Sequence, residues 1–165
     1  MKFGKTDIPA LSVNIPEANY EKTLKVWIKN LESGTQSNVA TENNEMSIFG
    51  ANLKDISPTP INVYSKLISG DSTLQLSVSF ELGKDKYIDK VSGETDYSKA
   101  QNYLKQFAKN QYIKVAKERV DVEDKKLRDI QKELTSLEKE KSRLQKSIQS
   151  NNTTTLNEND NIAIQ

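Results

Sequence analysis

The chain contains neither cysteine nor histidine among its 165 residues. It therefore has no thiol nucleophile, no imidazole base and no thiolate or imidazole ligand for a metal. Ser-His-Asp and Cys-His triads, zinc hydrolase motifs and haem held by histidine or cysteine are excluded. The absence of cysteine does not decide the compartment, because a protein without disulfides is compatible with both the cytosol and export.

The chain also lacks a large net charge and long apolar runs. Lys and Arg total 24 against 23 for Asp and Glu, which gives a formal net charge of +1. Because so balanced a chain has no net field to attract a polyanion, we expect no nucleic-acid partner. No apolar run approaches the roughly 20 residues that span a bilayer, and the first residues are too short in apolar content for a signal peptide. The sequence predicts no transmembrane segment and leaves open whether a signal peptide was removed.

The remaining residue types form no recognisable catalytic or metal-binding motif. The chain has no glycine-rich phosphate loop. An enzyme that uses only Asp, Glu, Lys, Tyr and Ser is possible, as in glycosidases, but no carboxylate pair can be nominated. We therefore predict no enzyme activity, no catalytic residues, no cofactor and no metal.

The first two thirds of the chain have the pattern of a small α+β domain. Leu11, Val13 and Ile15 alternate with polar residues, which predicts a strand that ends at Pro16. Apolar residues at helical spacing follow between residues 18 and 33: Tyr20, Leu24, Trp27, Ile28 and Leu31. Gly34 comes where a helix end favours positive φ, so this stretch predicts an amphipathic helix with the only Trp on its apolar face.

A hairpin is the clearest β signal. Residues 61–67 and 74–82 both alternate between apolar and polar residues, and a Ser-Gly-Asp-Ser turn separates them. Two weaker strands are expected between residues 35 and 50, joined by a turn at Asn43 and Asn44. With helices segregated from strands, the predicted fold is a two-layer antiparallel sheet with helices on one face.

The segment from Asp96 to Ser150 contains no Gly and no Pro and predicts a long helix. In its later part the apolar residues keep a heptad repeat, which is typical of a coiled coil. The predicted interface consists of Ile113, Ala116, Val120, Leu127, Ile130, Leu134, Leu137, Leu144 and Ile148. Glu123 and Lys141 interrupt it. An earlier stripe that includes Leu104 and Phe107 does not continue the heptad, so we expect it to pack on the sheet.

These patterns predict three parts. Residues 1–112 form the small α+β domain, including the start of the long helix, and residues 113–150 form a coiled-coil stalk. Residues 151–165 are rich in Asn and Thr and poor in apolar residues, which predicts a disordered tail.

The stalk needs a partner, because an apolar seam would otherwise face water. A parallel homodimer would set Glu133 against Glu138 of the other copy. An antiparallel homodimer centred between Leu127 and Ile130 would instead place Arg119 near Glu140 and Lys126 near Glu133. We favour the antiparallel homodimer, although another helical protein, or the surface of the chain's own domain, could also fill the seam at 113–148.

Several segments carry a resemblance to a known family. They are Ile15-Pro16 with the Tyr20 to Leu31 helix, the strand from Pro60 to Tyr64, the strand from Leu76 to Gly83, and the helix that becomes a coiled coil. In these segments the chain resembles an uncharacterised bacterial family of small exported proteins. The resemblance covers nearly the whole chain to about Ser150 and implies a location outside the cytoplasm, periplasmic or on the outer surface. It implies no catalytic residues.

Two functions fit these expectations. The first is a non-catalytic interaction or assembly module, in which the helix sets the oligomeric state and the polar sheet face with Gln75, Ser77, Ser79 and Glu81 is available to a partner. The second is an exported domain that binds a small ligand or the cell wall, with the helix as a spacer. A cytoplasmic location is the alternative to export.

Overall fold

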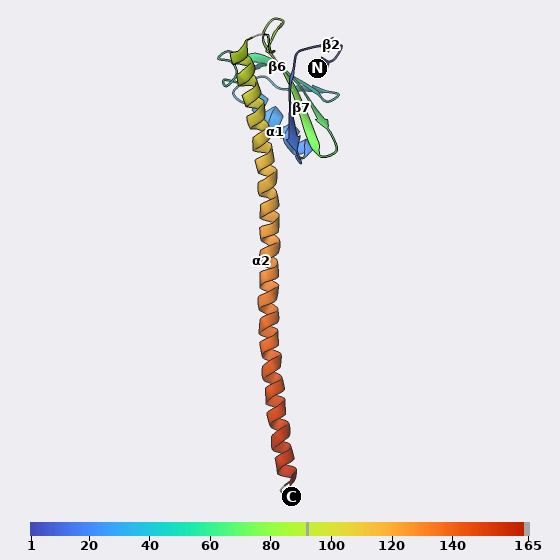
Figure 1. Ribbon diagram of the computed structural model, residues 1–165, viewed down its shortest axis with the longest axis vertical. Coiled ribbons are helices and arrows are strands. Elements are labelled where there is room, and N and C mark those ends of the chain that lie inside the picture. The colour runs from blue at the N-terminus through green and yellow to red at the C-terminus, as the bar shows by residue number, and fades with distance from the viewer. Residues whose placement is uncertain (92, 164–165) are drawn as a thin grey trace. The chain divides into compact units, whose positions relative to one another are not determined.

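The computed structural model describes residues 1–91 and 93–163, with residues 156–163 described by their backbone alone. The chain divides into two units, Met1–Lys117 and Glu118–Gln165. The first unit has an α+β fold with a six-stranded antiparallel sheet and a short helix (Figure 1). Helix α2 (Glu94–Ala163) begins in the first unit and makes up the described part of the second. The predicted fold class is confirmed.

The sheet is built around the predicted hairpin. Strands β6 (Ile61–Ser69) and β7 (Thr73–Gly83) pair with Leu67 opposite Leu76. The strand order is β3 (Leu11–Pro16), β7, β6, β5 (Glu45–Ala51) and β4 (Ala40–Glu42), and β8 (Lys86–Tyr87) also pairs with β7. Alternation along these strands gives the sheet one apolar face, as the sequence predicts.

Helices cover that apolar face. Trp27 of helix α1 (Tyr20–Glu32) is fully buried, and its ring nitrogen Nε1 donates a hydrogen bond of 2.9 Å to Ser65 Oγ on β6. The ring of Phe107 on α2 meets Trp27 edge-on, with 5.0 Å between centroids. Ala100 and Leu104 of α2 join the same core. The predicted two-layer packing, with the start of the long helix beside Trp27, is confirmed.

Local signals set the ends of α1. The side chain of Asn19 accepts a hydrogen bond of 3.0 Å from the backbone N–H of Lys22, which caps the first turn. Gly34 follows the helix with a φ of 73°, a conformation that glycine adopts without steric cost. Between β4 and β5, Asn43 and Asn44 both have positive φ, as the predicted hairpin turn requires.

An N-terminal hairpin was not predicted. Strands β1 (Lys2–Phe3) and β2 (Thr6–Asp7) are too short to show an alternating pattern. The Phe3 ring packs edge-on against Tyr64, with centroids 5.2 Å apart, and the carboxylate of Glu45 accepts the N–H of Gly4 at 2.9 and 3.0 Å. This hairpin therefore covers part of the polar face of the sheet.

The C-terminal segment differs from the prediction of a disordered tail at 151–165. Helix α2 continues through Asn151 to Ala163. The segment contains no Gly and no Pro to end the helix. The hydroxyl groups of Thr153 and Thr155 each donate a 3.0 Å hydrogen bond to the carbonyl four residues earlier, at Gln149 and Asn151. Residues 164 and 165 lie outside the described residues. The predicted division at Tyr112 and Ser150 stays a prediction.

Candidate functional site

The predicted coiled-coil interface forms an exposed apolar stripe on α2, here called the α2 stripe. Its larger side chains are exposed by between 38% for Ile113 and 62% for Ile130. Ile113 and Ala116 belong to the first unit, and the other predicted interface residues, Val120, Leu127, Ile130, Leu134, Leu137, Leu144 and Ile148, belong to the second. Within the second unit, no other described side chain covers the stripe. Its role as an interface stays a prediction.

The polar interruption at Glu123 is accommodated within the helix. Its carboxylate forms an ion pair with Lys126 Nζ at 2.8 Å, one turn along α2. Such exposed pairs are worth a few tenths of a kcal/mol, so this contact does not itself define the stripe. Val122 is 53% exposed but lies off the stripe, at a different heptad position. Val122 is therefore a control residue for substitutions on the stripe, because it is an exposed apolar side chain that lies outside the stripe.

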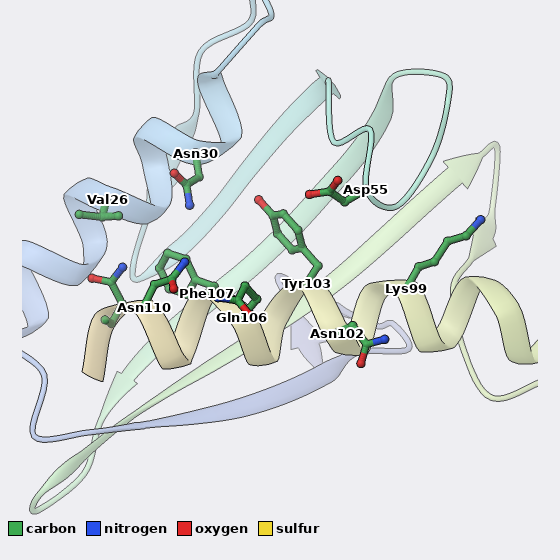
Figure 2. A pocket seen from close by; sticks show the side chains of 10 residues that line it. Val26, Asn30, Asp55, Lys99, Asn102, Tyr103, Gln106, Phe107 and Asn110 are labelled. Carbon is green, nitrogen blue, oxygen red and sulfur yellow. Dashed lines mark hydrogen bonds between the residues drawn. The ribbon is translucent and has the colours of Figure 1, made fainter. Parts of the chain in front are cut away.

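A second candidate site is a groove between α1 and α2 in the first unit, here called the amide groove (Figure 2). It has a volume of about 670 Å³. Its lining is rich in uncharged amides: Asn30 from α1 and Asn102, Gln106, Asn110 and Gln111 from α2. The amides of Asn102, Gln106 and Asn110 recur every four residues, so they follow one face of the helix. This four-residue spacing is visible in the sequence.

Tyr103 lies at the centre of the amide groove. Figure 2 shows its ring rising from α2 between Asn30 and Asp55. Burial raises the pKa of Tyr103 to about 12, and the negative charge of Asp55 adds to the effect. The hydroxyl therefore stays protonated at neutral pH and can both donate and accept a hydrogen bond. The groove combines the rings of Tyr103 and Phe107 with amides, the carboxylate of Asp55 and the amino group of Lys99.

The polar face of the sheet is less accessible than predicted. Gln75 is exposed and Ser77 is half-buried, but Ser79 and Glu81 are buried. Glu81 is enclosed by its own hydrogen bonds, from Asn62 Nδ2 at 2.9 Å, the Tyr64 hydroxyl at 3.0 Å and the backbone N–H of Asp85 at 3.0 Å. The prediction that these four side chains are available to a partner is wrong for Ser79 and Glu81.

These contacts shift two pKa values in opposite directions. The hydrogen bond from Asn62 is the largest cause that lowers the pKa of Glu81, and burial opposes it. Burial, together with the hydrogen bond to Glu81, raises the pKa of Tyr64 to about 12. The cluster is thus a carboxylate held by three donors and has a structural role on this face.

Other kinds of site are not found in the described part of the chain. No group of three or more Asp and Glu residues there is arranged to hold a metal ion. None of the described helices is long and apolar enough to cross a membrane.

Comparison with known proteins gives no relative. No protein-family model, curated protein or solved structure matches the chain.

Proposed function

We propose that this protein is a non-catalytic assembly module that uses the α2 stripe to bind a second copy of the chain. The observation that carries the proposal is the uncovered stripe itself. Leu127, Ile130, Leu134 and Leu137 are all more than half exposed over about three turns of helix. Burial of each such side chain in a helix pair would contribute roughly 1.5–3 kcal/mol, which favours association over solvation of the stripe.

Charges beside the stripe favour an antiparallel pair. With Leu127 opposite Ile130 of the second copy, Lys126 faces Glu133 and Arg119 faces Glu140. Each of these pairs occurs twice by symmetry. Lys117 would face Glu138 in the same register, and this pair is also attractive. No like charges face each other at these flanking positions.

The charges beside the stripe do not favour a parallel pair. It would bring Arg119 close to Asp124 of the second copy, which is attractive, and Glu133 close to Glu138, which is repulsive. The two contacts cancel, so the parallel register gains nothing from the flanking charges. A different helical protein that fills the stripe is the competing outcome.

The test compares two matched substitutions in the full chain, Val120→Glu on the stripe and Val122→Glu off it. The two valines are similarly exposed, at 58% and 53%. Light scattering on size-exclusion fractions should show a dimer for the natural chain and for Val122→Glu. Val120→Glu should weaken the dimer by more than about tenfold, because it buries a charge without a partner. A natural chain that is monomeric at every concentration would contradict self-association.

A second candidate function is binding of a small uncharged ligand, such as a cell-wall saccharide, in the amide groove. Amides both donate and accept hydrogen bonds, as sugar hydroxyls do, and Tyr103 offers an aromatic surface. Thermal unfolding with chitooligosaccharides and peptidoglycan fragments tests this candidate. A ligand at 100 times its dissociation constant should add about 2.7 kcal/mol of stability, and Asn30→Ala should abolish the effect. No stabilisation across these compounds would count against this candidate.

We also propose that the protein acts outside the cytoplasm, on the strength of its resemblance to small exported bacterial proteins. Antibody detection in cytoplasmic and periplasmic fractions of bacterial cells that produce the protein tests the location. Detection in the cytoplasmic fraction alone would contradict export.

A further inference from the structure

Strand β3 lies at one end of the sheet order and pairs only with β7 among the described strands. Its register places Pro16 opposite Thr73, and the next residue continues the ladder, because the N–H of Glu17 donates a 2.9 Å hydrogen bond to the carbonyl of Ser72. Hydrogen-bonded pairs alternate along an antiparallel ladder. Residues 11, 13 and 15 therefore bond to β7.

The same alternation turns the backbone of Ser12 and Asn14 away from β7. Their N–H and C=O groups point out from the edge of the sheet. Pro16 is the next outward position, where the lack of an N–H breaks no ladder bond. The free edge thus offers two donors and two acceptors, and Pro9 and Pro16 bound it along the chain.

A groove runs along this edge. It has a volume of about 330 Å³ and is lined on one side by Ala10, Leu11, Ser12 and Val13. Successive strand residues point to opposite faces of a sheet, so a groove that all four line must follow the edge itself. The opposite wall is one face of α2, with Tyr97, Gln101, Leu104 and Lys105.

A second groove extends the first. It has a volume of about 310 Å³, shares Ala10, Leu11 and Tyr97 with the first groove, and continues beside Asp89, Lys90 and Val91. The two together form a trough between the outer edge of β3 and helix α2. Lys90 and Lys105 against the single carboxylate of Asp89 give the trough a small positive excess.

We propose that the free edge of β3 binds an extended peptide segment of a partner protein, which adds to the sheet as a further strand. Outward backbone groups two residues apart, roughly 6.6 Å along the strand, match the spacing of another extended backbone. Alternate apolar side chains of the segment would contact Leu11 and Tyr97 in the trough. The two prolines limit the paired segment to about four or five residues, and the lysines favour an acidic residue within it. This binding is separate from assembly through the α2 stripe.

The test begins with the free protein. Amide hydrogen exchange should be fast at Ser12 and Asn14 and slow at Val13 and Ile15, because only the latter pair is bonded to β7. A phage-displayed library of random dodecapeptides, selected on the immobilised full chain, supplies the probes. Enriched peptides should alternate apolar and polar residues, and they should slow exchange at Ser12 and Asn14.

Two variants separate backbone pairing from side-chain contact. Asn14→Pro removes the outward N–H and should weaken the selected peptides roughly fivefold to tenfold, whereas Asn14→Val keeps that N–H and should leave binding unchanged. Circular dichroism checks that both variants fold. If Asn14→Pro does not fold, hydrogen exchange on the natural chain with and without a selected peptide still tests whether the peptide pairs with β3.

Three results would overturn the proposal. One is the absence of any enriched peptide, and another is equal binding to both variants. The third is slow exchange at Ser12 and Asn14 in the free protein that depends on its concentration, which would show that a second copy already pairs with this edge.

Discussion

Helix α2 contains two apolar stripes, and their surroundings differ completely. Leu104 in the first unit is only 2% exposed, whereas Leu134 in the second unit is 56% exposed. The first stripe, which includes Phe107, packs against Trp27 in a core that the sheet and α1 complete. The second repeats every 3.5 residues and packs against no other described element of the second unit. Two leucines in one helix therefore have different roles. Leu104 contributes to folding, and Leu134, as we propose, contributes to association.

The largest expected difference comes from truncating these two leucines. Leu104→Ala should destabilise the first unit by about 2–5 kcal/mol, because it leaves a cavity in a closed core. Leu134→Ala should leave the unfolding of that unit unchanged and weaken the dimer instead. Urea unfolding followed by fluorescence of Trp27, the only Trp, reports the core selectively. An equal loss in the free energy of unfolding in both variants would contradict the distinction between the two stripes.

Two buried serines of the sheet differ in their hydrogen bonding, and this difference allows a second comparison. Ser65 Oγ accepts the hydrogen bond from the Trp27 ring, whereas Ser79 Oγ has no hydrogen-bond partner among the described residues. Ser65→Ala should cost about 1–3 kcal/mol, because the ring nitrogen is left unsatisfied, while Ser79→Ala should be neutral or slightly stabilising. The same urea titrations measure both. A loss at Ser79 that matches the loss at Ser65 would show that the hydroxyl of Ser79 has a partner in solution.

Acid unfolding should reveal the contribution of the Glu81 carboxylate, which lies on the polar face of the sheet. The pKa of Glu81 is lower in the folded chain than its ordinary value of 4.5. Its contribution to the free energy of unfolding is therefore present above pH 4.5 and is lost as the pH falls through the lower folded value. Glu81→Gln should flatten the acid side of the curve of unfolding free energy against pH. An unchanged acid slope in this variant would contradict the role of Glu81.

The smallest expected effect distinguishes the two directions of the helix pair. Glu133→Lys would face Lys126 in the antiparallel dimer and should weaken it. In a parallel dimer the same change would face Glu138 and should strengthen it. Exposed pairs of this kind change the dissociation constant roughly twofold to fivefold, which sedimentation equilibrium resolves. The double variant Lys126→Glu, Glu133→Lys should restore the antiparallel dimer.

Much of the fold was predictable because it depends on local periodicity. Alternating apolar residues predict the buried face of β6 and β7, and the helical stripe around Trp27 predicts the buried face of α1. The Asn43-Asn44 turn was predictable for a similar reason, because both residues tolerate positive φ. The N-terminal hairpin was not, since its two-residue strands depend on contacts with Tyr64 and Glu45 that are distant in sequence.

The candidate sites were only partly predictable. The heptad residues from Val120 to Ile148 could be named because the repeat itself carries the signal. The burial of Glu81 could not be foreseen, since it depends on Asn62 and on the N–H of Asp85. The amide groove and the trough beside β3 arise where separate elements meet, so no single stretch of sequence encodes either one.

The most direct test of assembly through α2 is a distance between spin labels in the full chain. Lys146→Cys introduces the only cysteine, on the helix face away from the stripe. In the proposed antiparallel dimer the two labels are about 35 helical residues apart, so pulsed dipolar spectroscopy should give a distance of about 50 Å. A distance of about 20 Å would contradict the antiparallel direction, and the absence of any dipolar signal at high concentration would contradict self-association.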